Sequence, residues 1–152
     1  MVRCQFLRTS KMRKPLLATL FTSLLWSTVA PAEPTYIEKM TGLPAICSID
    51  AIEQQTKVWG AERKYGEGSK PWSEAFHHRL DVVRVCVDDA KSKGKALYKA
   101  ETDRLPQLKS ELANMYVSWL GYLDHLIDDD RDAYLRVYEH SANQLKAQID
   151  SM

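Results

Sequence analysis

The sequence predicts an all-α protein, an elongated antiparallel bundle of about four helices in which one disulfide links the first two. Three observations predict this fold. Apolar residues recur every three or four positions after residue 47, a turn-rich stretch lies at 66–71, and the midpoint of two cysteines, Cys47 and Cys86, falls within that stretch. Spacing of three and four places side chains on one stripe of a helix. No stretch alternates with period two for long enough to predict a strand.

The first two predicted helices flank the turn at 66–71. The first spans about 48–65 and is weakly patterned, with the stripe Ile49, Ile52, Thr56 and Trp59. The second spans about 73–103 and is the longest, with the stripe Phe76, Leu80, Val83, Val87, Ala90, Gly94 and Leu97. Ser73 is its predicted N-cap, because a serine oxygen there can accept a backbone N–H.

The third and fourth predicted helices follow without a long loop. The third spans about 106–127, with the stripe Leu105, Leu108, Leu112, Met115, Trp119, Tyr122 and Leu126. Pro106 fits its first turn, where the missing N–H would be unpaired anyway. The fourth spans about 130–150, with the stripe Leu135, Tyr138, Ala142, Leu145 and Ile149, and the aspartates at 128–130 offer it a cap. Residues 47–152 are therefore expected to form a single helical domain, preceded by an extended lead-in over 33–46.

The N-terminus has the three parts of a secretory signal peptide over residues 1–32. Basic residues, the last of them Lys14, precede an acid-free apolar core from Leu16 to Val29, and Ala30-Pro31-Ala32 follows. A membrane span needs roughly 20 predominantly apolar residues, and this core is shorter and interrupted by threonine and serine. We expect cleavage before Glu33, no stable membrane anchor afterwards, and a location in the periplasm of a Gram-negative bacterium or outside the cell.

Cleavage would change the charge of the chain. The whole chain has 21 basic and 20 acidic residues, and residues 1–32 contain five of the basic and none of the acidic ones. The remainder therefore has a formal charge of 16 − 20 = −4. Because binding to nucleic acid depends on neutralising phosphates with Lys and Arg, no nucleic-acid partner is expected. Translation from Met1 or from Met12 would give the same mature chain.

Cleavage also removes Cys4 and leaves Cys47 and Cys86, which predict one disulfide in an oxidising compartment. Two antiparallel helices joined at 66–71 would bring these cysteines side by side. Metal ligation by the pair is the alternative, but no neighbouring Cys or His completes a zinc-like spacing. In the chain-entropy model, closing a loop of this length stabilises a fold by roughly 4 kcal/mol.

Histidine and carboxylate side chains are candidate metal ligands, because imidazole nitrogens and carboxylate oxygens bind divalent ions. The candidates lie in two groups: Glu74, His77 and His78, and His125, Asp128 and Asp129. Ion pairs and helix caps explain the same residues without a ligand. There is no C-x-x-C-H motif, which excludes covalent c-type haem attachment. No metal or other cofactor is therefore expected.

A row of lysines on the second helix is a candidate binding surface. Lys91, Lys95 and Lys99 lie one turn apart. They could contact an anionic lipid, an acidic polysaccharide or an acidic partner. The alternative is an ordinary solvated face.

Aromatic residues of the third helix are the other candidates for partner binding, namely Trp119, Tyr122 and Tyr116. Gly121 leaves room beside Trp119 and Tyr122 for a close helix or a ligand. Tyr and Trp are enriched in interfaces, although the same residues also serve as bundle core.

The sequence has no enzyme motif: no G-x-S-x-G, no Gly-rich phosphate loop and no H-E-x-x-H. We therefore expect a non-catalytic protein that binds another envelope or periplasmic protein, such as an inhibitor, an immunity protein or an assembly factor. The alternative is a carrier of a small ligand or metal in the bundle core or on the histidines. The run from Cys86 to Trp119 is similar to small exported helical proteins of Gram-negative bacteria without an assigned activity. This similarity transfers no residue's role.

Overall fold

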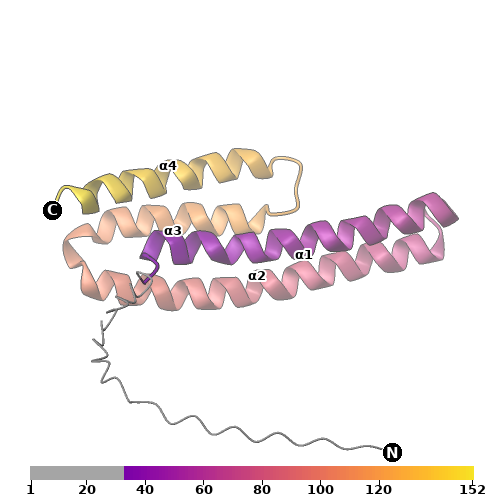
Figure 1. The fold of residues 1–152 in the computed structure, drawn as a ribbon, viewed down its shortest axis with the longest axis horizontal. Helices are drawn as coiled ribbons and strands as arrows, with labels where there is room; N and C mark the ends of the chain where they lie inside the picture. Colours follow the sequence, from indigo (N-terminus) through magenta and orange to yellow (C-terminus); the bar gives the residue numbers. More distant parts are fainter. Residues whose placement is uncertain (1–32) are drawn as a thin grey trace, which may run out of the picture. The chain divides into compact units, whose positions relative to one another are not determined.

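The computed structural model describes residues 33–152, and within this range the chain forms four α-helices and no strand (Figure 1). In chain order the elements are α1 (Tyr36–Tyr65), α2 (Lys70–Arg104), the 3-10 helix η1 (Pro106–Leu108), α3 (Lys109–Asp124) and α4 (Arg131–Asp150). The all-α prediction is confirmed, and the signal peptide predicted over 1–32 lies outside the described residues. None of the described helices is long and apolar enough to cross a membrane.

Helix α1 begins twelve residues before its predicted start, so the extended lead-in expected over 33–46 is wrong for most of its length. A capping box starts the helix. The Thr35 hydroxyl accepts the Glu38 N–H at 3.3 Å, and the Glu38 carboxylate accepts the Thr35 N–H at 2.7 Å. Pro44 lies inside the helix and leaves the carbonyl of Met40 without its usual N–H donor. The Trp119 indole N–H replaces that donor, at 2.8 Å from the Met40 oxygen.

Helix α2 begins earlier than predicted, because Ser69 rather than Ser73 is its N-cap. The Ser69 hydroxyl accepts the Trp72 N–H, and Pro71 occupies the first turn. Gly66 and Gly68 have positive φ values of 86° and 77°, which glycine adopts without strain and which reverse the chain between α1 and α2.

The later boundaries differ from the prediction in smaller ways. Pro106 opens the first turn as expected, but that turn is the separate 3-10 helix η1. Helix α3 ends at Asp124 instead of 127. Asp130 precedes α4 without making a side-chain capping bond, so the expected aspartate cap is absent there.

Helices α1 and α2 form an antiparallel pair, α3 packs on α4, and α2 also contacts α3. The stripes predicted for the third and fourth helices face the core: Leu112, Met115, Trp119 and Leu145 are fully buried. Burial also raises the pKa of the Tyr138 phenol, whose oxygen lies 2.7 Å from the Thr41 hydroxyl and joins α4 to α1. The predicted disulfide is confirmed: Cys47 of α1 is bonded to Cys86 of α2.

The stripe predicted for α1 faces the wrong way. Thr56 is exposed, and the side chains of Ile49, Ile52 and Trp59 are 65%, 63% and 53% exposed. The buried face of α1 consists instead of Tyr36, Met40, Pro44, Cys47, Ala51, Gln54 and Val58. The physical reason is the disulfide, which turns the Cys47 side of α1 toward α2.

The α1–α2 pair is longer than the α3–α4 pair. Helices α1 and α2 have 30 and 35 residues, whereas α3 and α4 have 16 and 20. At 1.5 Å per residue, the first pair is about 20 Å longer than the second. Figure 1 shows the turn end of α1 and α2 extending past the turn between α3 and α4. We call residues 56–78 the projecting hairpin.

Candidate functional site

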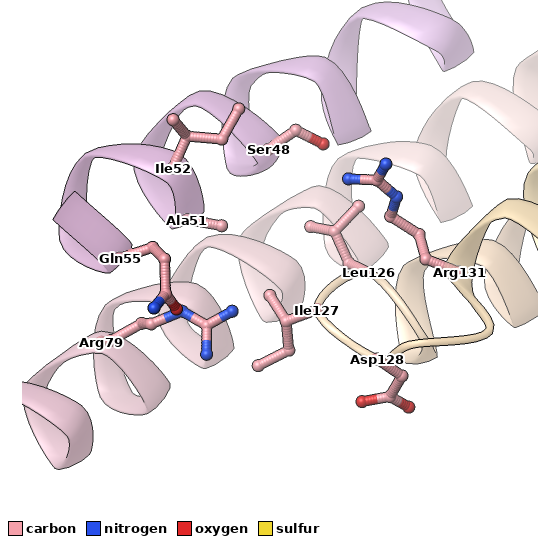
Figure 2. A pocket seen from close by; sticks show the side chains of 9 residues that line it. All are labelled: Ser48, Ala51, Ile52, Gln55, Arg79, Leu126, Ile127, Asp128 and Arg131. Atoms are coloured by element: carbon pink, nitrogen blue, oxygen red, sulfur yellow. The ribbon is translucent and has the colours of Figure 1, made fainter. Parts of the chain in front are cut away.

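A small hollow lies at the base of the projecting hairpin, where the α3–α4 turn meets α1 and α2 (Figure 2). We call it the hairpin notch; its volume is about 140 Å³. Helix α1 contributes Ser48, Ala51, Ile52 and Gln55, α2 contributes Arg79, and the α3–α4 region contributes Leu126, Ile127, Asp128 and Arg131. Ligand pockets for drug-sized molecules are usually about 300–1,000 Å³. The notch therefore has room for one side chain rather than a free ligand of that size.

The notch exists because α3 stops short while α1 and α2 continue. After Asp124 the chain turns, and Leu126 remains buried at 3% exposure as the last residue of the α3 stripe. Ala51 presents a small side chain on the opposite wall. In Figure 2 the guanidinium groups of Arg79 and Arg131 lie at opposite ends of the hollow, with Leu126 and Ile127 between them. The result is a hollow with both apolar and polar lining residues and a cation at each end.

Arg79 is the unusual charge in this arrangement. Its Nε is buried without a hydrogen-bond partner, and the side chain has no ion pair with any residue of 33–152. Its helical neighbours one turn away are apolar: Ala75, Phe76, Val82 and Val83. Gln55 of α1, which lines the same notch, is neutral. Arg131, by contrast, is bonded to Asp132 at 3.0 and 3.2 Å.

Beside the notch, His125, Asp128 and Asp130 bring three possible metal-ligand atoms within 4.8 Å of one another. His125 Nδ1 lies 2.9 Å from Asp128 and 3.6 Å from Asp130, and its ring stacks on Tyr134 with centroids 3.7 Å apart. The predicted group is thus partly assembled, with Asp130 in the place expected for Asp129. Among the described residues, no second group of this kind is present.

The other predicted metal group does not assemble. Glu74 lies 3.8 Å from Lys70, and the His77 ring meets Phe76 edge-on at 6.0 Å. His77 and His78 are both exposed. These residues make surface contacts and do not converge on a common point.

The aromatic candidates are core residues rather than a binding surface. Trp119 is fully buried, Tyr122 is buried, and Tyr116 is partly buried between Tyr98 and Trp119, at ring distances of 4.5 and 5.8 Å. The expectation that Trp119 and Tyr122 could meet a partner is therefore wrong. Their size and apolar character contribute to the core instead.

The room that a glycine leaves beside Trp119 is at Gly94 and not at Gly121. A Cβ on Gly121 would meet Tyr134 at an ordinary contact distance of 3.6 Å. A Cβ on Gly94 of α2 would lie 2.2 Å from the Trp119 ring. Gly94 is therefore the glycine that makes room for the tryptophan.

The predicted lysine row is partly neutralised. Lys91 forms an ion pair with Asp124, and the neighbouring Lys93 lies 2.7 Å from Asp89. Lys95 and Lys99 are exposed and have no ion pair within 33–152. What remains is two free lysines rather than a continuous basic stripe.

The surface that the sequence prediction missed is an apolar row on the outer side of α1. Ile46, Ile49, Ile52 and Trp59 are each more than half exposed. The position of Cys47 could have revealed it, because Ile49 lies about 200° around the helix from that cysteine at 3.6 residues per turn. A disulfide toward α2 therefore requires Ile49 to face solvent.

Comparison with known proteins gives no assignment. The sequence matches no protein-family model, and no curated protein or solved structure matches it. The resemblance noted for Cys86–Trp119 thus gains no support from these comparisons. Function has to be inferred from the residues and their arrangement.

Proposed function

We propose that this chain is an exported, non-catalytic helical protein that binds another protein of the bacterial envelope, as an inhibitor, an immunity protein or an accessory factor. The observation that carries the proposal is the apolar row on α1, in which Ile46, Ile49, Ile52 and Trp59 are 53–65% exposed. Large exposed apolar side chains that gather on one helix are typical of interaction sites. Tryptophan is enriched among the residues that contribute most to binding energy.

The projecting hairpin gives this row access to a partner. Its tip extends past the α3–α4 turn, so a second protein could contact Trp59 without meeting the rest of the bundle (Figure 1). Tyr65 at the same end of α1 is 52% exposed and adds a further aromatic side chain. A projecting rod with aromatic side chains fits a helix-in-groove contact.

Two features support export: the disulfide and the position at which the compact unit begins. The Cys47–Cys86 bond is of a type that persists in oxidising compartments such as the periplasm. The compact unit starts at Glu33, which is also the predicted mature N-terminus, so removal of 1–32 would leave the unit whole. A single chain with an N-terminal signal, a disulfide and no enzyme motif is consistent with a periplasmic binding partner.

Site-specific photo-crosslinking tests the binding function. A photo-reactive amino acid would replace Ile49 or Trp59, with Asn143 on the exposed side of α4 as the control position. We expect one abundant heterologous product from the two α1 positions and none from Asn143. Equal labelling from all three positions, or products that contain only this chain, would contradict the proposal.

A metal carrier is the second candidate, favoured by the convergence of His125, Asp128 and Asp130. Native mass spectrometry of protein purified without chelator, with added Zn²⁺ as the probe, tests it. One bound zinc that is lost in the His125→Ala variant would support a carrier. An unchanged mass at excess zinc would leave protein binding as the better function.

A further inference from the structure

We propose that the hairpin notch binds a carboxylate side chain of the partner protein, with Arg79 as its cation. The proposal rests on the protein-binding function and specifies the chemistry that the partner must present. It commits to a glutamate or aspartate flanked by aliphatic residues.

Arg79 differs from every comparable basic residue in the described range. Four basic residues of 33–152 are partly buried: Lys39, Arg79, Lys91 and Arg131. Three of them have a carboxylate partner, respectively Glu33, Asp124 and Asp132. Arg79 has none, and its Nε is buried without a hydrogen bond. A buried N–H without an acceptor costs stability, so an external carboxylate that accepts from this group would remove a penalty that the isolated chain carries.

Carboxylates are lacking only around Arg79, because the range 33–152 as a whole has four more acidic than basic residues. The acidic residue that lines the notch, Asp128, lies 2.9 Å from His125 Nδ1. The second cation of the notch, Arg131, is already paired with Asp132. Arg79 is therefore the charged group of the notch that has no partner within 33–152.

The walls of the notch select what accompanies the carboxylate. Ala51, Ile52, Leu126 and Ile127 give the hollow its apolar part. In Figure 2 the terminal nitrogens of Arg79 lie toward Ile127, so methylene groups leading to a carboxylate could pack on Ile127. Exclusion of water by such walls strengthens a charge-assisted hydrogen bond. The volume of about 140 Å³ limits the occupant to a single side chain.

The notch is continuous with the apolar row on α1. Ile52 belongs to both, since it lines the notch and is 63% exposed. A partner seated on Ile49 and Ile52 would therefore have its next residues over Arg79. This continuity points to an acidic side chain within the same contact surface, rather than to a free anion.

Two matched peptides test the assignment by NMR on ¹⁵N-labelled protein from expression of the full chain. The probe is acetyl-Leu-Glu-Leu-amide, and its control is the isosteric Leu-Gln-Leu peptide. We expect the glutamate peptide to shift the amide signals of Ala51, Arg79 and Ile127. The glutamine peptide should bind roughly tenfold more weakly, as expected for loss of about 1.4 kcal/mol. Equal binding of the two peptides, or no shift at these residues, would overturn the proposal.

Three variants place the effect on Arg79. Arg79→Gln should reduce binding of the glutamate peptide to the level of the glutamine peptide. Arg136→Gln, which removes an exposed arginine of α4 that has no ion pair within 33–152, should leave it unchanged. Gln55→Glu should supply a carboxylate from α1, raise the melting temperature and block the peptide. If Arg79→Gln fails to fold, the Gln55→Glu variant still decides, because unaltered peptide binding there contradicts the assignment.

The outcomes separate this inference from the proposed function. Crosslinks from Ile49 and Trp59 without peptide binding at Arg79 would keep the protein-binding function and reject the notch. Peptide binding at Arg79 without any heterologous crosslink would keep Arg79 as a carboxylate-binding group and reject the protein partner.

Discussion

Trp119 joins three helices through two residues that usually weaken a helix. Pro44 removes the N–H that would otherwise bond the Met40 carbonyl, and the Trp119 indole N–H takes its place at 2.8 Å. Gly94 removes the side chain that would otherwise occupy the volume of the Trp119 ring. Each apparent defect in α1 or α2 is therefore compensated by one side chain of α3.

Replacing Gly94 with alanine should destabilise the protein. The new Cβ would lie 2.2 and 2.6 Å from two ring atoms of Trp119, so the ring or α2 must move. We expect a loss of about 1–3 kcal/mol, in spite of the gain of about 1 kcal/mol in helix propensity. Thermal unfolding, monitored by circular dichroism, measures this change in stability.

Gly60→Ala in α1 is the matched control for Gly94→Ala. Nothing lies within 4 Å of the Cβ that it would add, so it should stabilise by about 0.5–1 kcal/mol. If both variants gain stability, the close approach of Trp119 to Gly94 is contradicted.

Replacing Trp119 with phenylalanine tests the bond to Met40. The Met40 carbonyl would lose its donor, and Pro44 cannot supply one, so the free energy of unfolding should fall by about 1–3 kcal/mol. The loss should be smaller in a Pro44→Ala background, where the new backbone N–H can bond the same carbonyl. A double-mutant cycle of chemical denaturation curves gives the coupling. Additive effects would show that the indole bond contributes nothing.

At the scale of helices, the disulfide determines which face of α1 meets α2. Cys47 is fully buried and bonded to Cys86, so the residues in phase with Cys47, such as Ala51 and Val58, face α2. The isoleucines on the opposite side of α1 are exposed, although they are more apolar than a buried residue such as Ala51. The weak apolar stripe predicted for α1 therefore does not face the core, because the disulfide turns the Cys47 side of the helix toward α2.

Reduction of the disulfide should lower stability without removing most of the helix. The loop between the cysteines spans 39 positions, for which the chain-entropy model gives about 4 kcal/mol as an upper figure. Helices α3 and α4 contain no cysteine and should keep their helicity when the α1–α2 pair loosens. Melting curves and far-UV circular dichroism with and without reductant measure this. Two freely alkylatable thiols in the folded protein would show that the bond does not form in solution.

At the scale of the whole molecule, the unequal helix pairs separate two regions. One region holds four helices around a common core, and the other is the projecting hairpin, where α1 and α2 rely on each other (Figure 1). Trp59 and Tyr65 lie in the second region and are more than half exposed. A two-helix projection has little core of its own, so contact with a partner would stabilise it.

Export predicts a mature N-terminus at Glu33. Intact-mass analysis of a periplasmic fraction should find a species that lacks residues 1–32, with a mass lower by two hydrogens than the reduced form because of the disulfide. A full-length species found solely in the membrane fraction would show that the N-terminal segment is retained as an anchor.

The helical class, the stripes of α3 and α4 and the Cys47–Cys86 pairing could all be predicted from the sequence. Each depends on local periodicity or on the position of a turn, which neighbouring residues determine. The sequence also brought His125 and Asp128 together, since they lie three residues apart.

Features that link distant parts of the chain could not be predicted and became visible in the packed helices. Trp119 and Met40 are 79 residues apart, and that bond explains why α1 continues through Pro44. The lack of an ion-pair partner for Arg79 likewise depends on which residues of α1 and the α3–α4 turn face it. None of these residues places a carboxylate within ion-pair distance of Arg79. Local patterns carry no information on such contacts, because packing between helices determines which side chains meet.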